Sequence, residues 1–90
     1  MDEFSVWVSR KARKKWEKLD PEMYERVEEA LIQLKTVPVP ASHFDVIKIK
    51  GKDSEYRIRI RRHRVLYKVK WEIKEIEVYD VDRRDEHTYD

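Results

Sequence analysis

A chain of 90 residues is one small domain, here taken as residues 1–90, with room for a single hydrophobic core. The lack of cysteine excludes a disulfide framework and a thiolate zinc site, which suits an intracellular, cytoplasmic protein, and no apolar run is long enough to span a membrane. The net charge is only +2, yet residues 48–70 carry 10 basic and 2 acidic side chains, a pattern that favours phosphate partners.

The first half of the chain predicts one strand and two helices. A strand is expected over residues 3–8, where the aliphatic or aromatic residues at positions 4, 6 and 8 alternate with Glu, Ser and Trp at positions 3, 5 and 7. A helix over residues 10–19 follows, with Ser9 as a suitable N-cap. Asp20-Pro21 then opens a second helix over residues 21–36, because a capping carboxylate followed by proline at the first helical position is a strong start signal.

Strands dominate the second half. They are expected over residues 46–50, 56–61, 64–71 and 75–81. The resulting order, β-α-α-β-β-β-β, predicts an α+β fold in which two N-terminal helices pack on one face of a mainly antiparallel sheet. The tryptophans at positions 7, 16 and 71 are interpreted as core or partner-groove residues.

Arginine alternates with apolar residues in the strand over 56–61. Because successive side chains of a strand point to opposite faces, Arg57, Arg59 and Arg61 are expected on the face that the helices leave open. On the next strand Arg64 and Lys68 share a face, and antiparallel pairing could bring Arg64 beside the others. Like charges opposite one another destabilise a sheet, so the pattern suggests that an anion binds there.

Other charged residues leave two interpretations open. Lys48 and Lys50 share a face of their strand. They either extend the row of basic residues that could bind phosphates, or only make the strand more soluble. The arginines of the open face could instead form ion pairs with Glu75 and Glu77.

The histidines lack the spacing of metal ligands, so no metal site is predicted. His63 is interpreted as a turn residue, and a general acid or base role for His87 stays open.

Three blocks of the sequence resemble the toxins of the RelE/ParE superfamily, in particular the archaeal type of RelE. They are VPASHFDVIKIKG (39–51), YRIRIRRHRVLYKVKW (56–71) and VDRRDEHTY (81–89). The resemblance implies a RelE-like α+β domain and a toxin of a type II toxin–antitoxin pair. The likeness to RelE in particular implies a ribosome-dependent endonuclease that cleaves mRNA in the A site without a metal or cofactor. Its implied partners are a cognate antitoxin, the ribosome and mRNA.

The resemblance also implies the residues of the site. In this family the 2′-hydroxyl of the RNA attacks its own 3′ phosphate, and basic residues on the sheet stabilise the phosphorane. The matching catalytic positions are Arg57, Arg59, Arg64, Arg83, the adjacent Arg84, and Tyr89 as the terminal aromatic. The basic residues expected to contact RNA around them are Lys48, Lys50, Arg61 and Lys68.

One departure from the family pattern concerns the general base. The bacterial representative has lysines where this chain has Arg57 and Arg59, and arginine is effectively always protonated, so it is a poor base. The group that removes the proton therefore stays open. Two alternatives follow from the same resemblance: a catalytically silent member that binds RNA or an antitoxin, and a ParE-like poison of DNA gyrase.

Overall fold

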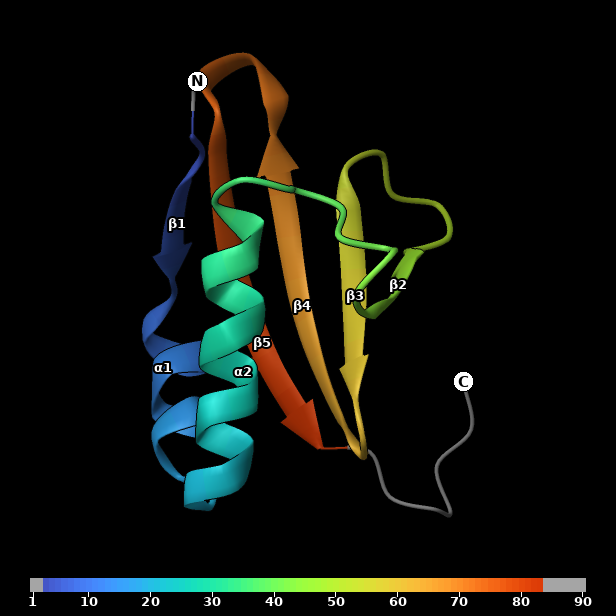
Figure 1. Ribbon diagram of the computed structural model, residues 1–90. Coiled ribbons are helices and arrows are strands. Elements are labelled where there is room, and N and C mark those ends of the chain that lie inside the picture. Colours follow the sequence, from blue (N-terminus) through green and yellow to red (C-terminus); the bar gives the residue numbers. More distant parts are fainter. Residues whose placement is uncertain (1–2, 84–90) are drawn as a thin grey trace.

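Two helices and one five-stranded sheet make up the computed structural model, which describes residues 3–83 (Figure 1). The helices are α1 (Arg10–Glu17) and α2 (Pro21–Leu34), and a short 3₁₀ turn spans Trp71–Ile73. The strands are β1 (Ser5–Val8), β2 (Asp45–Lys48), β3 (Glu55–Ile60), β4 (His63–Lys70) and β5 (Glu75–Arg83). The predicted element order and α+β class are confirmed, with boundaries that differ by two residues or fewer.

Both helices begin at the predicted caps. The Ser9 hydroxyl accepts a hydrogen bond from the backbone N–H of Ala12 at 3.1 Å. The Asp20 carboxylate does the same for the N–H of Met23 at 2.9 Å. Each bond satisfies one of the amide groups that the first turn of a helix leaves without a partner, so these two residues fix where the helices start.

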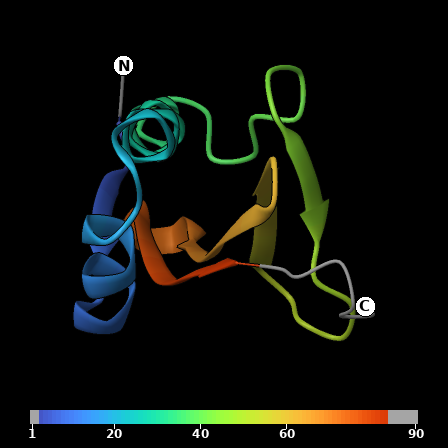
Figure 2. The same ribbon diagram turned by 90° about the horizontal axis from the view of Figure 1, so that it is seen from below.

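The sheet has the strand order β1-β5-β4-β3-β2. All neighbours are antiparallel except β1 and β5, which are parallel. β1 accompanies β5 only from Glu75 to Val78, and beyond that point α1 packs along β5. Figure 2 shows α1 at this edge, α2 to one side of the sheet, and the other face of the sheet uncovered by helices.

The core lies between α2 and the sheet. Ile58, Val65, Tyr67 and Val78 are fully buried there. Tyr67 stacks on Tyr56 with ring centroids 5.7 Å apart, and its hydroxyl donates a hydrogen bond to the carbonyl oxygen of Pro38 at 2.8 Å. This packing holds β3 beside β4, and it therefore also sets the relative positions of the residues on the opposite face of these strands.

The three tryptophans have different environments. Trp16 packs against the core and stacks on Tyr24 at 4.7 Å. Trp7 and Trp71 are 61% and 47% exposed, so the interpretation as core residues holds only for Trp16. Within residues 3–83, neither helix is long and apolar enough to cross a membrane.

Candidate nucleic-acid interface

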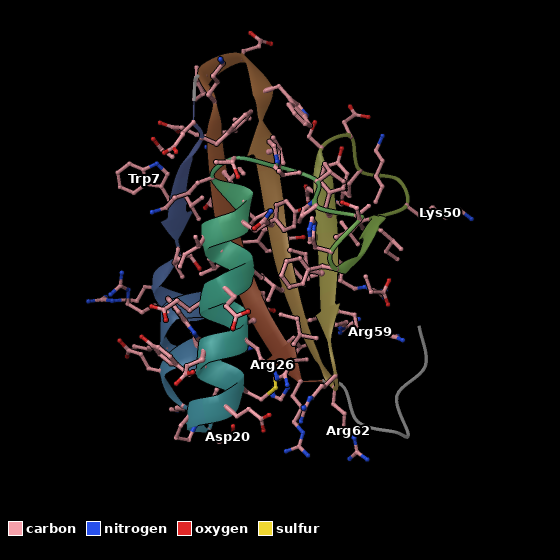
Figure 3. The ribbon with its side chains drawn as sticks, viewed as in Figure 1. Trp7, Asp20, Arg26, Lys50, Arg59 and Arg62 are labelled. Carbon is pink, nitrogen blue, oxygen red and sulfur yellow. The ribbon has the colours of Figure 1, made fainter. Side chains whose placement is uncertain are left out.

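Three arginines lie side by side on the open face of the sheet. Arg59 of β3 is directly opposite Arg64 of β4, and Arg57, two residues along the same face, is opposite Leu66. The intervening Ile58 is fully buried on the helical side. Figure 3 shows Arg59 projecting from β3 on the side away from α2. The predicted grouping is therefore confirmed, and these residues are called the arginine cluster (Arg57, Arg59 and Arg64).

Arg64 is held by a carboxylate of the neighbouring strand. Its guanidinium donates to the Asp82 carboxylate at 2.9 Å, and Asp82 is directly opposite Arg64 in the register of β4 and β5. Burial alone raises the pKa of Asp82, but the hydrogen bond from Arg64 and the charges of Lys15 and Arg64 outweigh it, so this pKa lies below its usual value. Asp82 therefore stays ionised and orients Arg64 on the open face.

The acidic residues of β5 are further neutralised by α1. Lys15 contacts Asp80 at 3.0 Å and Asp82 at 4.0 Å, and Lys11 contacts Asp80 at 3.6 Å. These lysines compensate the carboxylates that would otherwise attract the arginine cluster. The carboxylates predicted as alternative partners, Glu75 and Glu77, lie opposite lysines of β4 instead.

Arg57 and Arg59 differ from Arg64 because no carboxylate of residues 3–83 forms an ion pair with either of them. Asp45 of β2 is opposite Arg59 in the register, yet the two form no ion pair. The Nε atom of Arg57 is buried and has no hydrogen-bond partner within the same part of the chain. An arginine without a carboxylate partner is suited to phosphate oxygens, which its guanidinium can bind in a bidentate manner.

The positive surface ends one row further along the strands. Lys68, predicted to bind RNA, does lie on the open face, but it is opposite Glu55 on one side and Glu77 on the other. Lys70 lies 3.9 Å from Glu77. The charges in these rows largely cancel, so the arginine cluster forms a confined anion site rather than a long track.

Tyr79 is a further candidate residue near the arginine cluster, and the sequence pattern did not reveal it. The pairing of β4 with β5 shifts between Leu66 and Tyr67, so that Tyr79 is an extra, bulged residue in β5. Its hydroxyl donates to the Glu55 carboxylate of β3 at 2.9 Å and therefore reaches across β4. Burial, followed by the bond to Glu55, raises the pKa of Tyr79 to about 12. Bulges often aim a side chain at a functional site.

We expect Tyr79→Phe to weaken RNA binding by up to about fivefold. Glu55 lies two residues from Arg57 on the same face, and without the tyrosine hydroxyl it would be free to pair with Arg57; a partly exposed ion pair contributes about 0.2–1 kcal/mol. Fluorescence anisotropy with a short RNA that carries 2′-O-methyl groups measures the affinity. Tyr79→Phe combined with Glu55→Gln should bind as well as the parent protein, and a loss that persists in the double variant would exclude this explanation.

Two lysines predicted to contact RNA lie elsewhere. Val46 of β2 is opposite the buried Ile58, so Lys48, two residues on, leaves the strand on the helical side and not beside the arginine cluster. Lys50 follows the end of β2, and Figure 3 shows it projecting outward from the far edge of the sheet. The structure therefore does not place Lys48 or Lys50 beside the arginine cluster, and their contact with RNA stays a prediction.

Arg61 does not share the face of Arg57 and Arg59, contrary to the prediction. It has a positive φ of 56° in the tight turn between β3 and β4, which ends the strand alternation. Its guanidinium contacts Glu22 of α2 at 3.2 Å, on the helical side.

The C-terminal candidates are only partly described. Arg83 ends β5 opposite His63, so its side chain lies toward the helical side of the sheet rather than in the arginine cluster. Arg84, His87 and Tyr89 lie outside the described residues, and their roles stay predictions. Across residues 3–83, histidine, aspartate and glutamate side chains form no group of three or more that could hold a metal ion.

Comparison with known proteins supports the resemblance seen in the sequence. A profile of the family described as the ParE toxin of the type II toxin–antitoxin system parDE matches residues 6–88. The chain is also 34% identical, over 82 residues, to a Methanocaldococcus jannaschii protein provisionally designated toxin RelE1, and this match covers 91% of each protein.

Solved structures share the fold over nearly the whole chain. A chain of the archaeal RelE–RelB complex from Pyrococcus horikoshii OT3 has a TM-score of 0.83 and 32% identity, covering 92% of this chain and 97% of that one. The intact Escherichia coli RelBE toxin–antitoxin complex gives a TM-score of 0.76 at 23% identity, covering 91% and 98%; this second likeness concerns the fold alone. Together with the family profile, these matches make the chain a member of the RelE/ParE superfamily of type II toxin–antitoxin toxins.

Proposed function

We propose that this toxin is a ribosome-dependent endonuclease that cleaves mRNA in the A site, in the cytoplasm. The observation that carries the proposal is the arginine cluster: Arg57 and Arg59 lie on the open face of the sheet without a carboxylate partner among residues 3–83, while Asp82 orients Arg64 beside them. A purely structural surface would be expected to mix charges and neutralise each arginine. This one keeps two cations available for a phosphate.

The cluster suits a reaction in which the RNA supplies its own nucleophile. When a 2′-hydroxyl attacks the neighbouring phosphate, negative charge accumulates on the phosphorane oxygens and the 5′-oxygen is released. Guanidinium groups that are already in place stabilise this charge without reorganising during the reaction. Since arginine cannot act as the base, we propose that positioning of the RNA and charge stabilisation by the cluster supply most of the rate.

A cognate antitoxin is the proposed protein partner. The Pyrococcus horikoshii relative forms a RelE–RelB complex, and so does the Escherichia coli one. We propose that an antitoxin segment covers or displaces part of the basic face here as well, which would prevent RNA from reaching the arginine cluster.

The direct test is to add the purified toxin to a translating extract and map the 5′ ends of the mRNA. We expect new ends within codons that occupy the A site, and none when ribosomes are omitted. Equal cutting of free RNA would contradict the ribosome requirement. If no cuts appear although translation is proceeding, the nuclease proposal fails for this protein.

A second candidate is favoured by the family profile, which is described by ParE rather than RelE. A ParE-like gyrase poison would accumulate cleaved DNA complexes in a supercoiling assay and leave mRNA intact. We rank it second because a poison of that kind has less need of unpaired arginines on the central strands. The gyrase assay, run beside the mRNA mapping, separates the two functions.

A further inference from the structure

A cavity of about 710 Å³ lies at one end of the sheet, on the helical side. It is bounded by the corner between α1 and α2, by the turn between β3 and β4, and by the last residues of β5. Asp20 and Arg62, labelled at the lower end of the molecule in Figure 3, belong to its wall. This volume is within the range of sites that bind small organic ligands. We call it the end cavity, and its lining residues used below are Lys18, Leu19, Met23, His63, Val81 and Arg83.

The lining combines apolar walls with a positive rim. Leu19, Met23 and Val81 supply the apolar surface. The acidic residues at the rim already have partners, since Asp20 caps α2, Glu22 contacts Arg26 and Arg61, and Asp82 holds Arg64. By contrast, Lys18 and Arg83 have no carboxylate partner among residues 3–83. An apolar slot with cations at its mouth is suited to an aromatic ring that carries an anionic group.

His63 lines the same cavity, and one of its ring nitrogens lacks a partner. Its Nδ1 is buried and has no hydrogen-bond partner within the described chain. Burial, together with the charge of Arg83, lowers the pKa of His63, although Asp20 and Asp82 act in the opposite direction. The ring is therefore neutral at pH 7 and offers one donor and one acceptor nitrogen. Buried polar atoms without a partner are uncommon and costly, so a ligand that reaches Nδ1 gains a hydrogen bond without displacing one.

The end cavity adjoins the arginine cluster. Asp82 lines the cavity and holds Arg64 on the open face at 2.9 Å, so this residue belongs to both sites. Arg64 directly follows His63 in β4, and the two side chains leave the strand on opposite faces at the end of the sheet. A polynucleotide bound at the cluster can therefore continue around the sheet end into the cavity.

We propose that the end cavity binds one nucleotide of the RNA, next to the phosphate held by the arginine cluster. The base packs against Leu19, Met23 and Val81, its edge hydrogen-bonds to His63, and the adjoining phosphate meets Lys18 and Arg83. His63 is then a residue that selects the nucleotide at one position of the cut codon. The identity of the ligand rests on the proposed nuclease function, whereas the binding site itself can be tested without cleavage.

The test is a nuclear magnetic resonance titration of protein with labelled histidine and methionine. The probes are the four nucleoside 3′-monophosphates, and inorganic phosphate serves as the anion without a base. We expect at least one nucleotide to shift the His63 ring and Met23 methyl signals in a saturable way, while phosphate alone does not. His43, an exposed loop residue whose ring contacts only Ser42 within residues 3–83, is an internal control that should not move.

Matched variants identify the contacts. His63→Gln and Lys18→Glu should each weaken nucleotide binding about tenfold, because each removes one hydrogen bond or charge contact to the ligand, and His43→Gln should leave it unchanged. In the translating extract, His63→Gln should still cut mRNA but with a changed nucleotide preference at one codon position.

Several results would overturn the inference. Nucleotides that fail to shift the His63 and Met23 signals, or that shift them no more than inorganic phosphate does, exclude a nucleotide site in the cavity even if the toxin cuts mRNA. Conversely, saturable shifts in a protein that never cuts mRNA would retain the site and refute only the nuclease function.

Discussion

Replacing Arg57 and Arg59 together with alanine should reduce mRNA cleavage by about a thousandfold or more, since removal of even one preorganised donor to a transition-state oxyanion typically lowers the rate by 10²–10³. Both side chains lie on the open face without a carboxylate partner among residues 3–83, so their charge is directed at the ligand. Single-turnover cleavage on stalled ribosomes measures the effect. Lys35→Ala with Lys52→Ala, which removes two exposed charges away from the cluster, should cut at nearly the parental rate.

The salt dependence of RNA binding provides a second measurement for the same variant. For single strands the slope of log affinity against log salt is about −0.7 per phosphate contact, so the loss of two contacts should reduce its magnitude by about 1.4. An unchanged slope together with unchanged cleavage would mean that the arginine cluster does not hold the phosphate.

Loss of Arg59 should lower the cleavage activity but not the stability of the fold. Arg59 faces Arg64 directly across β3 and β4, and like charges in such a pair destabilise a sheet. Arg59→Ala alone is therefore expected to leave the free energy of unfolding unchanged or slightly raised. A variant that gains stability and loses activity indicates a residue retained for function, and denaturant melts beside the cleavage assay distinguish this from a simple folding defect.

Local signals in the sequence are sufficient to predict the helices and strands, and to predict which face each side chain of β3 occupies. Ser9 and Asp20 cap their helices with hydrogen bonds to residues three positions away, so a short stretch of sequence contains the whole interaction. The alternation in β3 likewise fixes the faces of Ile58 and Arg59, because one face must be buried beneath α2.

Edge and turn residues were less predictable for a physical reason. β2 is an outer strand whose Ile47 stays 47% exposed on the open face, so burial gives little guidance to which face its lysines occupy. Register with β3 decides instead, and it places Lys48 on the helical side. At Arg61 a positive φ interrupts the alternation altogether.

The electrostatics of the site depend on contacts between distant parts of the chain. Lys15 and Asp80 are 65 residues apart in sequence, yet they are in contact at 3.0 Å. This contact helps to neutralise the carboxylates of β5, so that these cancel less of the positive charge of the arginine cluster. The bond from Tyr79 to Glu55 requires a bulge in β5 that no composition signal marks. Such features follow from the three-dimensional pairing of strands, which a single sequence does not specify.

Stability should depend strongly on Tyr67, which packs beneath the arginine cluster. Tyr67→Ala removes a fully buried ring and should cost about 3–5 kcal/mol, as for other large core aromatics. Tyr67→Phe keeps the ring but leaves the Pro38 carbonyl without its 2.8 Å donor, which should cost about 1–2 kcal/mol and lower Tm by roughly 5–15 °C. Denaturant and thermal unfolding measure both changes.

Tyr56→Phe is the matched control, because within residues 3–83 its hydroxyl has no hydrogen-bond partner, and its ring stacks on the same Tyr67. This variant should leave the free energy of unfolding nearly unchanged.

Alkaline pH offers an independent check of the role of Tyr67. Burial, and then the charge of Tyr56, raises the pKa of Tyr67, so the folded state keeps the hydroxyl proton while the unfolded chain loses it above about pH 10. Stability should therefore fall as the pH rises beyond that value, and fall less steeply in Tyr67→Phe. Equal costs for the two phenylalanine variants would show that the bond to Pro38 does not anchor β4.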